Sequence, residues 1–133
     1  MSKVKRKLTT ILATDCVGFS KRMDENEELT LENLKACRSI IDPQIKEFGG
    51  RIFYTAGDSV IAEFESPVEC VNAAIGFQKA INDRNNTLPQ ESQLDWRVGI
   101  HLDDVIIEGD NVYGNGVNIA ARLETACSPG QIL

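Results

Sequence analysis

Hydrophobic and polar positions along the chain alternate between short β-branched runs and helical spacing. The apolar run over Leu8–Ala13 predicts a buried strand, because its length and its β-branched residues suit one. Apolar residues then recur every three or four positions over Glu27–Phe48, which predicts an amphipathic helix. Pro43 is expected to kink or restart this helix, and Gly49-Gly50 to end it.

A pair of strands and a second helix follow. The strands are predicted over Arg51–Tyr54 and Ser59–Phe64, around a tight turn that contains Gly57. The helix begins at Ser66-Pro67, because proline is favoured in the first turn of a helix. Its apolar spacing predicts an inner face formed by Val71, Ala74, Ile75, Gln78 and Ile81.

The remaining strands complete a βαββαβ order. Leu94–His101 is predicted as a strand, and Val105–Glu108 either pairs with it or extends the same sheet edge. This order is that of the ferredoxin-like fold, an α+β sheet with its helices on one face, here with an additional helix after the fourth strand region. The first and third strands of that fold are antiparallel neighbours. Asp15 and Asp58, at adjoining ends of these strands, are therefore expected to lie side by side.

Two carboxylates at neighbouring strand ends are typical of a metal site. They repel each other unless they share a proton or a cation. Hard divalent cations such as Mg²⁺ prefer oxygen ligands and leave coordination places for phosphate. Either aspartate alone is more simply explained as a turn cap, but the convergence of Asp15 and Asp58 favours a metal site.

A glycine turn directly follows the first aspartate. Gly18 allows the backbone to turn closely, and the helix or turn that begins near Phe19 and Ser20 presents N–H groups suited to phosphate oxygens. This turn is a weak signal alone, and Phe19 is equally suited to the core. The turn therefore adds to the aspartate pair rather than standing for a site by itself.

A polar stripe occupies the predicted C-terminal helix. Asn118, Arg122 and Thr125 fall at positions i, i+4 and i+7 after Gly116. The planar, permanently charged guanidinium of arginine suits a crowded phosphate in a transition state. A surface ion pair between Arg122 and Glu124 or Glu108 is the alternative that spacing alone favours.

Composition and charge narrow the class of protein. At 133 residues, with 42% hydrophobic residues, the chain is long enough for one domain with its own core. The net charge of −6 includes four basic residues among the first seven, so we predict a basic tail over residues 1–7 and an acidic domain over residues 8–133. Such a domain repels nucleic acid. The four scattered cysteines indicate reduced thiols and a cytoplasmic location.

Four segments together resemble the class III adenylate/guanylate cyclase catalytic domain of bacterial type. The resemblance covers nearly the whole chain from Leu8, and because several motifs occur in the family's order it is far more specific than any one of them. The segments are Asp15-Cys16-Val17-Gly18-Phe19-Ser20, Thr55-Ala56-Gly57-Asp58, Val98-Gly99-Ile100-His101 and Tyr113-Gly114-Asn115-Gly116-Val117-Asn118-Ile119-Ala120-Ala121-Arg122.

The resemblance implies an enzyme that converts ATP to 3′,5′-cyclic AMP and pyrophosphate, for intracellular signalling. Asp15 and Asp58, with the backbone carbonyl of Cys16, would hold two Mg²⁺ or Mn²⁺ ions, and Gly18, Phe19 and Ser20 would lie against the triphosphate. The ribose would be oriented by Asn118, and the transition state stabilised by Arg122. Family members place the carboxylates and the Asn/Arg pair on different subunits, which implies a homodimer with sites at the interface.

The residues that read the base depart from the usual adenylate cyclase pattern. Tyr54 stands where these enzymes usually carry lysine, and Asn111 stands where they often carry aspartate. A tyrosine hydroxyl and an asparagine amide each donate or accept, so the pair suits adenine or guanine. ATP is favoured on family grounds, and GTP remains open.

Other hypotheses follow from further departures. Relatives continue beyond the Leu133 position with more strands and a triphosphate-binding lysine, which implies a C-terminally truncated domain, and family members are commonly fused to regulatory domains. A catalytically silent module that binds nucleotide and dimerises is therefore an alternative, and a metal-free ferredoxin-like interaction domain is another. A diguanylate cyclase is disfavoured because no Gly-Gly-Asp/Glu-Glu-Phe run occurs.

Overall fold

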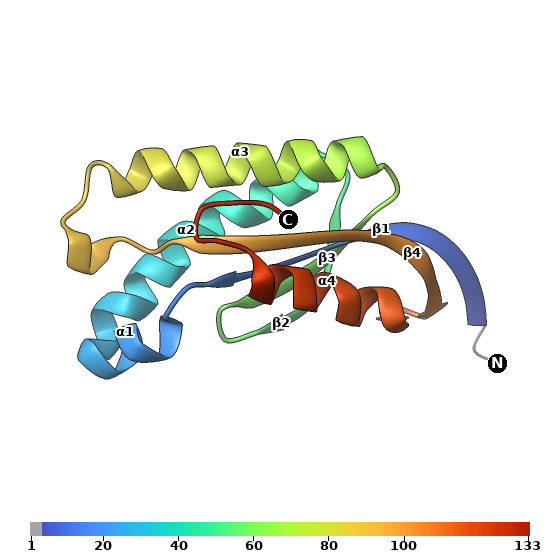
Figure 1. The fold of residues 1–133 in the computed structure, drawn as a ribbon, viewed down its shortest axis with the longest axis horizontal. Helices are drawn as coiled ribbons and strands as arrows, with labels where there is room; N and C mark the ends of the chain where they lie inside the picture. The colour runs from blue at the N-terminus through green and yellow to red at the C-terminus, as the bar shows by residue number, and fades with distance from the viewer. Residues whose placement is uncertain (1–3) are drawn as a thin grey trace.

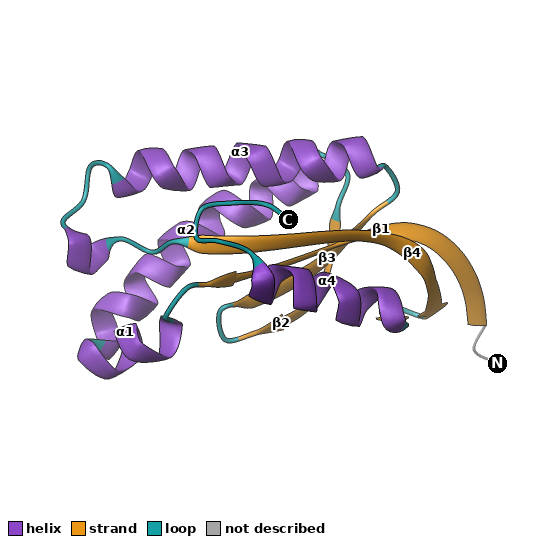
Figure 2. Ribbon diagram, viewed as in Figure 1, coloured by secondary structure: helices purple, strands orange, loops and turns teal. Residues whose placement is uncertain are grey.

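A computed structural model of the chain describes residues 4–133, which form one curved sheet with helices on both faces (Figure 1). The strands and helices follow the predicted order, with a short helix α1 and a short strand β5 in addition, and Figure 2 colours them by secondary structure. In chain order they are β1 (Val4–Cys16), α1 (Phe19–Glu25), α2 (Glu27–Glu47), β2 (Arg51–Ala56), β3 (Ser59–Phe64), α3 (Pro67–Asn85), the 3-10 turn Gln90–Ser92, β4 (Trp96–Glu108), β5 (Asn111–Tyr113) and α4 (Asn115–Ala126).

The sheet has the predicted ferredoxin-like topology. Its strand order is β2-β3-β1-β4-β5, and β1 is antiparallel to both of its neighbours. The β5 strand pairs with the end of β4 and was not predicted as a separate strand. The predicted strand Leu94–His101 and the segment Val105–Glu108 are parts of the single long strand β4.

The basic N-terminal segment is part of this sheet. β1 begins at Val4, where it pairs with Glu108, so residues 4–7 are part of the sheet and not of a separate tail, although the side chains of Lys5 and Arg6 are exposed. Lys5, Arg6 and Lys7 are held by pairing with the far end of β4, a tertiary interaction that their charge does not reveal. Residues 1–3 of the predicted tail lie outside the described part of the chain.

Two apolar layers flank the sheet. Leu12, on one face of β1, belongs to a core formed with α2 and α3, whereas Ile11 and Ala13 pack with Val117 and Ala120 of α4. Successive residues of a strand point to opposite faces, so β1 contributes to both layers. Figure 1 shows α2 and α3 on one side of the sheet and α4 on the other.

The helices mostly begin and end where the sequence predicts. The Asn26 side chain accepts the N–H of Leu29 at 3.1 Å and caps α2, and Gly49, at φ 81°, lies in the left-handed conformation that follows the helix end. Pro43 lies inside α2 without ending it. Ser66 caps α3 through the N–H of Glu69, at 3.2 Å.

The buried face of α3 differs from the predicted one. Ala74, Gln78 and Ile81 are buried as expected, but Val71 and Ile75 are 40% and 52% exposed. Phe77 is fully buried, together with Cys70 and Ala73. The helix carries apolar residues on more than one side, and burial of the large ring of Phe77 selects which side faces the sheet.

The helix α4 lies unusually close to β4. A Cβ built on Gly99 of β4 would lie 2.3 Å from both the carbonyl oxygen of Ala120 and the backbone nitrogen of Glu124. Only a residue without a side chain allows this approach. The contact fixes the C-terminal half of α4 over the end of the sheet where β1 and β4 carry Asp15 and Arg97. Among the helices of the described residues, none is long and apolar enough to cross a membrane.

Candidate active site

The two aspartates converge at one end of the sheet, as the topology predicts. The Oδ2 atom of Asp58 accepts the backbone N–H of Cys16, the residue after Asp15, at 2.9 Å. The pKa of Asp58 is raised, mainly by burial and further by the negative charge of Asp15, while the backbone donors oppose the shift. Among residues 4–133, no three His, Cys, Asp or Glu side chains are grouped so as to hold a cation.

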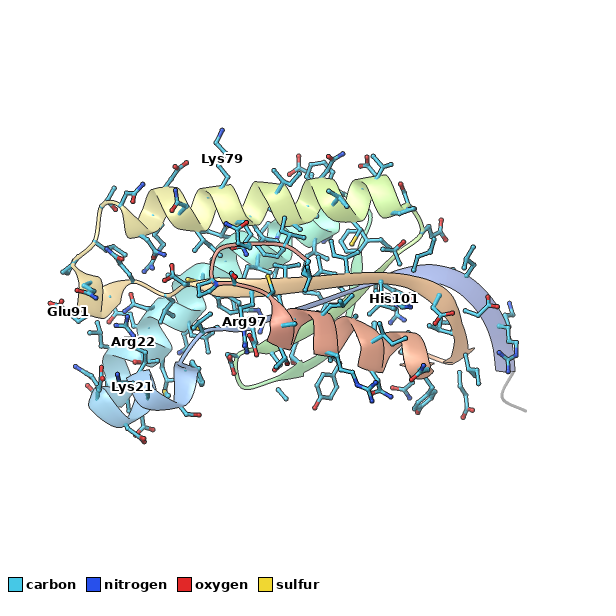
Figure 3. All side chains as sticks on the ribbon, in the orientation of Figure 1. Lys21, Arg22, Lys79, Glu91, Arg97 and His101 are labelled. Carbon is cyan, nitrogen blue, oxygen red and sulfur yellow. The ribbon has the colours of Figure 1, made fainter. Side chains whose placement is uncertain are left out.

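Arg97 of β4 forms a bidentate salt bridge with the carboxylate of Asp15. Its Nε donates to Oδ1 at 2.9 Å and its Nη2 to Oδ2 at 2.8 Å, so that both carboxylate oxygens are bound. Its Nη1 donates to the carbonyl oxygen of Thr125 in α4 at 3.3 Å. Figure 3 labels Arg97 on the side of the sheet that carries α4. Both side chains are mostly buried, with 24% of Arg97 and 17% of Asp15 exposed.

A third carboxyl group belongs to the same cluster. Glu124 of α4 is 8% exposed, held over the sheet by the close contact between α4 and Gly99. Burial and then the charge of Asp15 raise the pKa of Glu124 to about 8, and the Arg97 guanidinium opposes the shift. This shift favours the neutral form of Glu124, which lessens the repulsion among Asp15, Asp58 and Glu124.

The turn after β1 has the conformation expected of a phosphate-facing backbone. Gly18 lies at φ 66°, in the left-handed region that favours glycine, and precedes the first residue of α1. No side chain of the described part of the chain caps this helix, so the N–H groups of its first turn remain for another acceptor. Ser20 is exposed, whereas Phe19 is partly buried and packs against the core between the sheet, α2 and α3.

The two predicted base-reading residues share one cavity. Tyr54 of β2 and Asn111 of β5 lie on opposite edges of the sheet in strand order, yet both line an apolar cavity of about 270 Å³. The curvature of the sheet brings these edges together, and Arg51 of β2 donates to the carbonyl oxygen of Asp110 at 3.0 Å. The other lining residues are Phe53, Ile61, Val112, Tyr113 and Val117.

The predicted polar stripe on α4 faces outward. Asn118 and Arg122 are exposed, and with Ala121 and Thr125 they line a separate depression of about 390 Å³. Glu124, on the buried side of the helix, faces Asp15 instead. Within a single chain, the exposed Asn118 and Arg122 therefore lie on the side of α4 opposite to Glu124, which faces Asp15.

Sequence reasoning missed Arg97 and Glu124 as members of this site. Asp15 and Arg97 are direct partners in the β1–β4 register, so a correct pairing of these two strands would have identified Arg97. Glu124 was considered only as a surface ion-pair partner of Arg122, off the polar stripe of α4. Its position two residues after Arg122 gave no signal, because its burial depends on how closely α4 approaches Gly99.

The sequence and the fold match known proteins. The family of adenylate and guanylate cyclase catalytic domains matches over residues 2–133. "Putative adenylate cyclase 3" of Rhizobium meliloti is 37% identical over 130 residues, which are 97% of this chain and 22% of that protein. The chain thus spans about a fifth of the length of the curated relatives it matches.

Solved structures of cyclases superpose on the chain. An adenylate/guanylate cyclase/hydrolase from Silicibacter pomeroyi superposes with a TM-score of 0.90 at 36% identity, covering 98% of this chain and 76% of the other. The adenylyl cyclase CyaB from P. aeruginosa superposes with a TM-score of 0.84 at 25% identity, covering 98% and 77%. With its topology, its convergent aspartates and these matches, the chain belongs to the adenylate and guanylate cyclase catalytic domain family.

Proposed function

We propose that this domain converts ATP to 3′,5′-cyclic AMP and pyrophosphate. The observation that carries the proposal is the placement of Asp58 against the backbone of Cys16, beside Asp15, in a chain of this family. The reaction joins the ribose 3′-oxygen to the α-phosphorus and breaks the bond from that phosphorus to the bridging oxygen of pyrophosphate. The hydroxyl proton leaves to solvent, so no side-chain base is required.

The aspartate pair suits divalent cations. Asp15 and Asp58 are hard oxygen donors at adjoining strand ends, and the raised pKa of Asp58 is the response expected of a buried carboxyl beside another negative charge. These residues, with the carbonyl oxygen of Cys16, would hold two Mg²⁺ or Mn²⁺ ions. When bound, such ions lower the pKa of an attacking hydroxyl and neutralise phosphate charge.

The rest of the chain supplies binding and charge stabilisation. The uncapped first turn of α1 after Gly18 offers N–H groups to the triphosphate, with Phe19 and Ser20 at the contact. On α4, Asn118 would orient the ribose, and Arg122 would stabilise the charge that develops on the phosphoryl oxygens. Because this pair faces outward on its own chain, we propose a homodimer in which each Asn/Arg pair completes the partner's site.

Base selection falls to the cavity shared by Tyr54 and Asn111. Both groups can donate or accept, so they can satisfy the edge of adenine, and of guanine as the second candidate. Replacing them together by Tyr54→Lys and Asn111→Asp, the usual adenylate cyclase pair, is expected to raise the preference for ATP over GTP by about tenfold. The measurement is the ratio of kcat/KM for the two nucleotides.

The activity is tested by incubating the protein with Mn²⁺ and either ATP or GTP, and identifying products by mass. Cyclic AMP is the expected product, and cyclic GMP alone would replace ATP by GTP as substrate. Asp58→Asn keeps an acceptor for the Cys16 N–H but loses the charge, and is expected to lower kcat by at least about 100-fold, or about 2.7 kcal/mol of transition-state stabilisation. Asp83→Asn, on the exposed surface of α3, removes the same charge and is expected to leave kcat unchanged.

Nucleotide binding without product, in wild type and in a C-terminally extended domain alike, would contradict the proposed catalysis. It would instead identify a module that binds nucleotide and dimerises without turnover. Absence of both Mn²⁺ and nucleotide binding would favour a metal-free interaction domain.

A further inference from the structure

The two aspartates of the site differ in the partners that they hold. Among residues 4–133, Asp58 accepts hydrogen bonds only from neutral backbone N–H groups, its own and that of Cys16. Asp15 instead binds a full positive charge, and the Arg97 fork uses both of its oxygens at 2.9 and 2.8 Å. The Asp58 carboxylate is therefore open to a cation, whereas the Asp15 carboxylate already binds the Arg97 guanidinium.

The geometry of the Asp15–Arg97 pair makes it strong. Bidentate arginine–carboxylate pairs are charge-assisted and geometrically matched, and this pair is mostly shielded from water. The two residues are also direct cross-strand partners, so the pairing of β1 with β4 places them opposite each other. The pair is thus a feature of the folded site and not a chance surface contact.

The Arg97 guanidinium has other contacts available when it releases Asp15. Its Nη1 already donates to the carbonyl oxygen of Thr125 at 3.3 Å, which anchors one end of the guanidinium on α4. Its side chain is 24% exposed, so the other end can turn to solvent or to an anion without being buried unpaired. The ion pair can therefore open while the fold remains intact.

We propose that Arg97 acts as the resident counter-ion of Asp15 and competes with the divalent cation for that carboxylate. A cation at Asp15 needs at least one oxygen that Arg97 now holds, and it is repelled by the guanidinium while the pair is closed. Arg97 is a positioning residue in this role. The inference rests on the proposed function, because it concerns how the same site takes up its cation.

The test measures Mn²⁺ affinity without nucleotide, by the electron paramagnetic resonance signal of free Mn²⁺. Arg97→Gln is expected to tighten the dissociation constant for Mn²⁺ by about tenfold, the factor that corresponds to one charge-assisted hydrogen bond. Arg97→Lys keeps the charge without the fork and is expected to give an intermediate affinity. A role in folding alone would not tighten cation binding, so this readout separates the two roles.

A matched control is available on α2. Arg38 binds Asp42 in the same two-bond geometry, at 2.8 and 2.9 Å, and Arg38→Gln removes the same charge and the same kind of pair. Its Mn²⁺ affinity is expected to equal that of wild type. Unchanged or weaker affinity in a folded Arg97→Gln protein would overturn the inference, as would an equal gain in Arg38→Gln.

A wild-type measurement covers the case in which the Arg97 variants misfold. The Nε–H proton of Arg97 is held in the ion pair and is expected to exchange slowly with water in ¹⁵N-resolved NMR spectra. Titration with Mg²⁺ should weaken or shift this signal as the pair opens. A signal that stays unchanged while Mg²⁺ binds would overturn the inference. The product assay tests the cyclase activity separately, since product formation by wild type does not depend on either of these outcomes.

Discussion

Replacing Gly99 by alanine tests how closely α4 must approach the sheet. The added Cβ would lie 2.3 Å from the carbonyl oxygen of Ala120 and from the nitrogen of Glu124, and 2.9 Å from the carbonyl carbon of Leu123. All three are backbone atoms, so no side chain can turn away to make room. Ordinary van der Waals contact requires separations about 1 Å larger, and α4 must therefore shift or tilt.

Gly99→Ala is expected to lower stability by overpacking, and activity by displacing residues of α4. Overpacking a well-packed interior typically lowers the free energy of unfolding by about 1–3 kcal/mol, and a helix backbone that cannot move locally favours the upper part of this range. In a domain of this size, a loss of about 2–3 kcal/mol corresponds to a fall in the melting temperature of roughly 7–10 °C. A shift of about 1 Å in α4 would also displace Asn118 and Arg122, and we expect cyclase activity to fall by about 100-fold.

Thermal and chemical denaturation, followed by circular dichroism, give the stability change. Gly76→Ala is the matched control, because the atom nearest to its added Cβ is the tip of the Gln44 side chain, at 2.6 Å, which can turn away. Alanine is also favoured over glycine inside a helix by about 0.5–1 kcal/mol, so this control should be neutral or stabilising. If Gly99→Ala unfolds at the same midpoint as wild type and keeps its activity, the close packing of α4 on β4 is wrong.

Two further predictions concern assembly and the thiols. Equal mixing of inactive Asp58→Asn and Arg122→Ala proteins, unfolded and refolded together, should restore about a quarter of wild-type activity, because half of the dimers would carry one intact site; no recovery would contradict shared sites. Burial raises the pKa of Cys16 and of Cys70 to about 12, so neither thiol should react with a disulfide reagent at pH 8 until the protein is unfolded. Rapid stoichiometric labelling of either cysteine in the native protein would show that the core is more open than described.

The meeting of Asp15 and Asp58 could be predicted from the sequence, because it depends only on the order of the elements. Once β1 and β3 are antiparallel neighbours, the end of one strand must lie beside the start of the other. The shared cavity of Tyr54 and Asn111 follows instead from the curvature of the sheet, which joins its two edges. The sequence placed these two residues together only through the family resemblance.

The parts of the site that sequence reasoning missed depend on register and packing distance. The predicted strand Leu94–His101 includes Arg97, but the first strand was predicted to end at Ala13, two residues before Asp15, so the pairing of Asp15 with Arg97 was missed. The prediction of the buried side of α3 was wrong for a related reason. Val71 and Ile75 are exposed, although they follow a helical spacing as regular as that of the buried residues. Local pattern identifies the element, and long-range packing decides which side of it is covered.

Because β1 pairs with β4 along its whole length, the arrangement of the site depends on the register of these two strands. The two strands pair without a break from Val4 with Glu108 to Cys16 with Trp96. Deleting or inserting one residue within either strand would turn every later side chain to the opposite face of the sheet. With such a change in β1 before Asp15, this residue would face α2 and α3 instead of Arg97 and α4, and a protein of normal helix and strand content would be catalytically inactive. Length changes in descendants of this sequence should therefore be confined to its loops, such as the segment between α3 and β4, while β1 and β4 keep a constant number of residues.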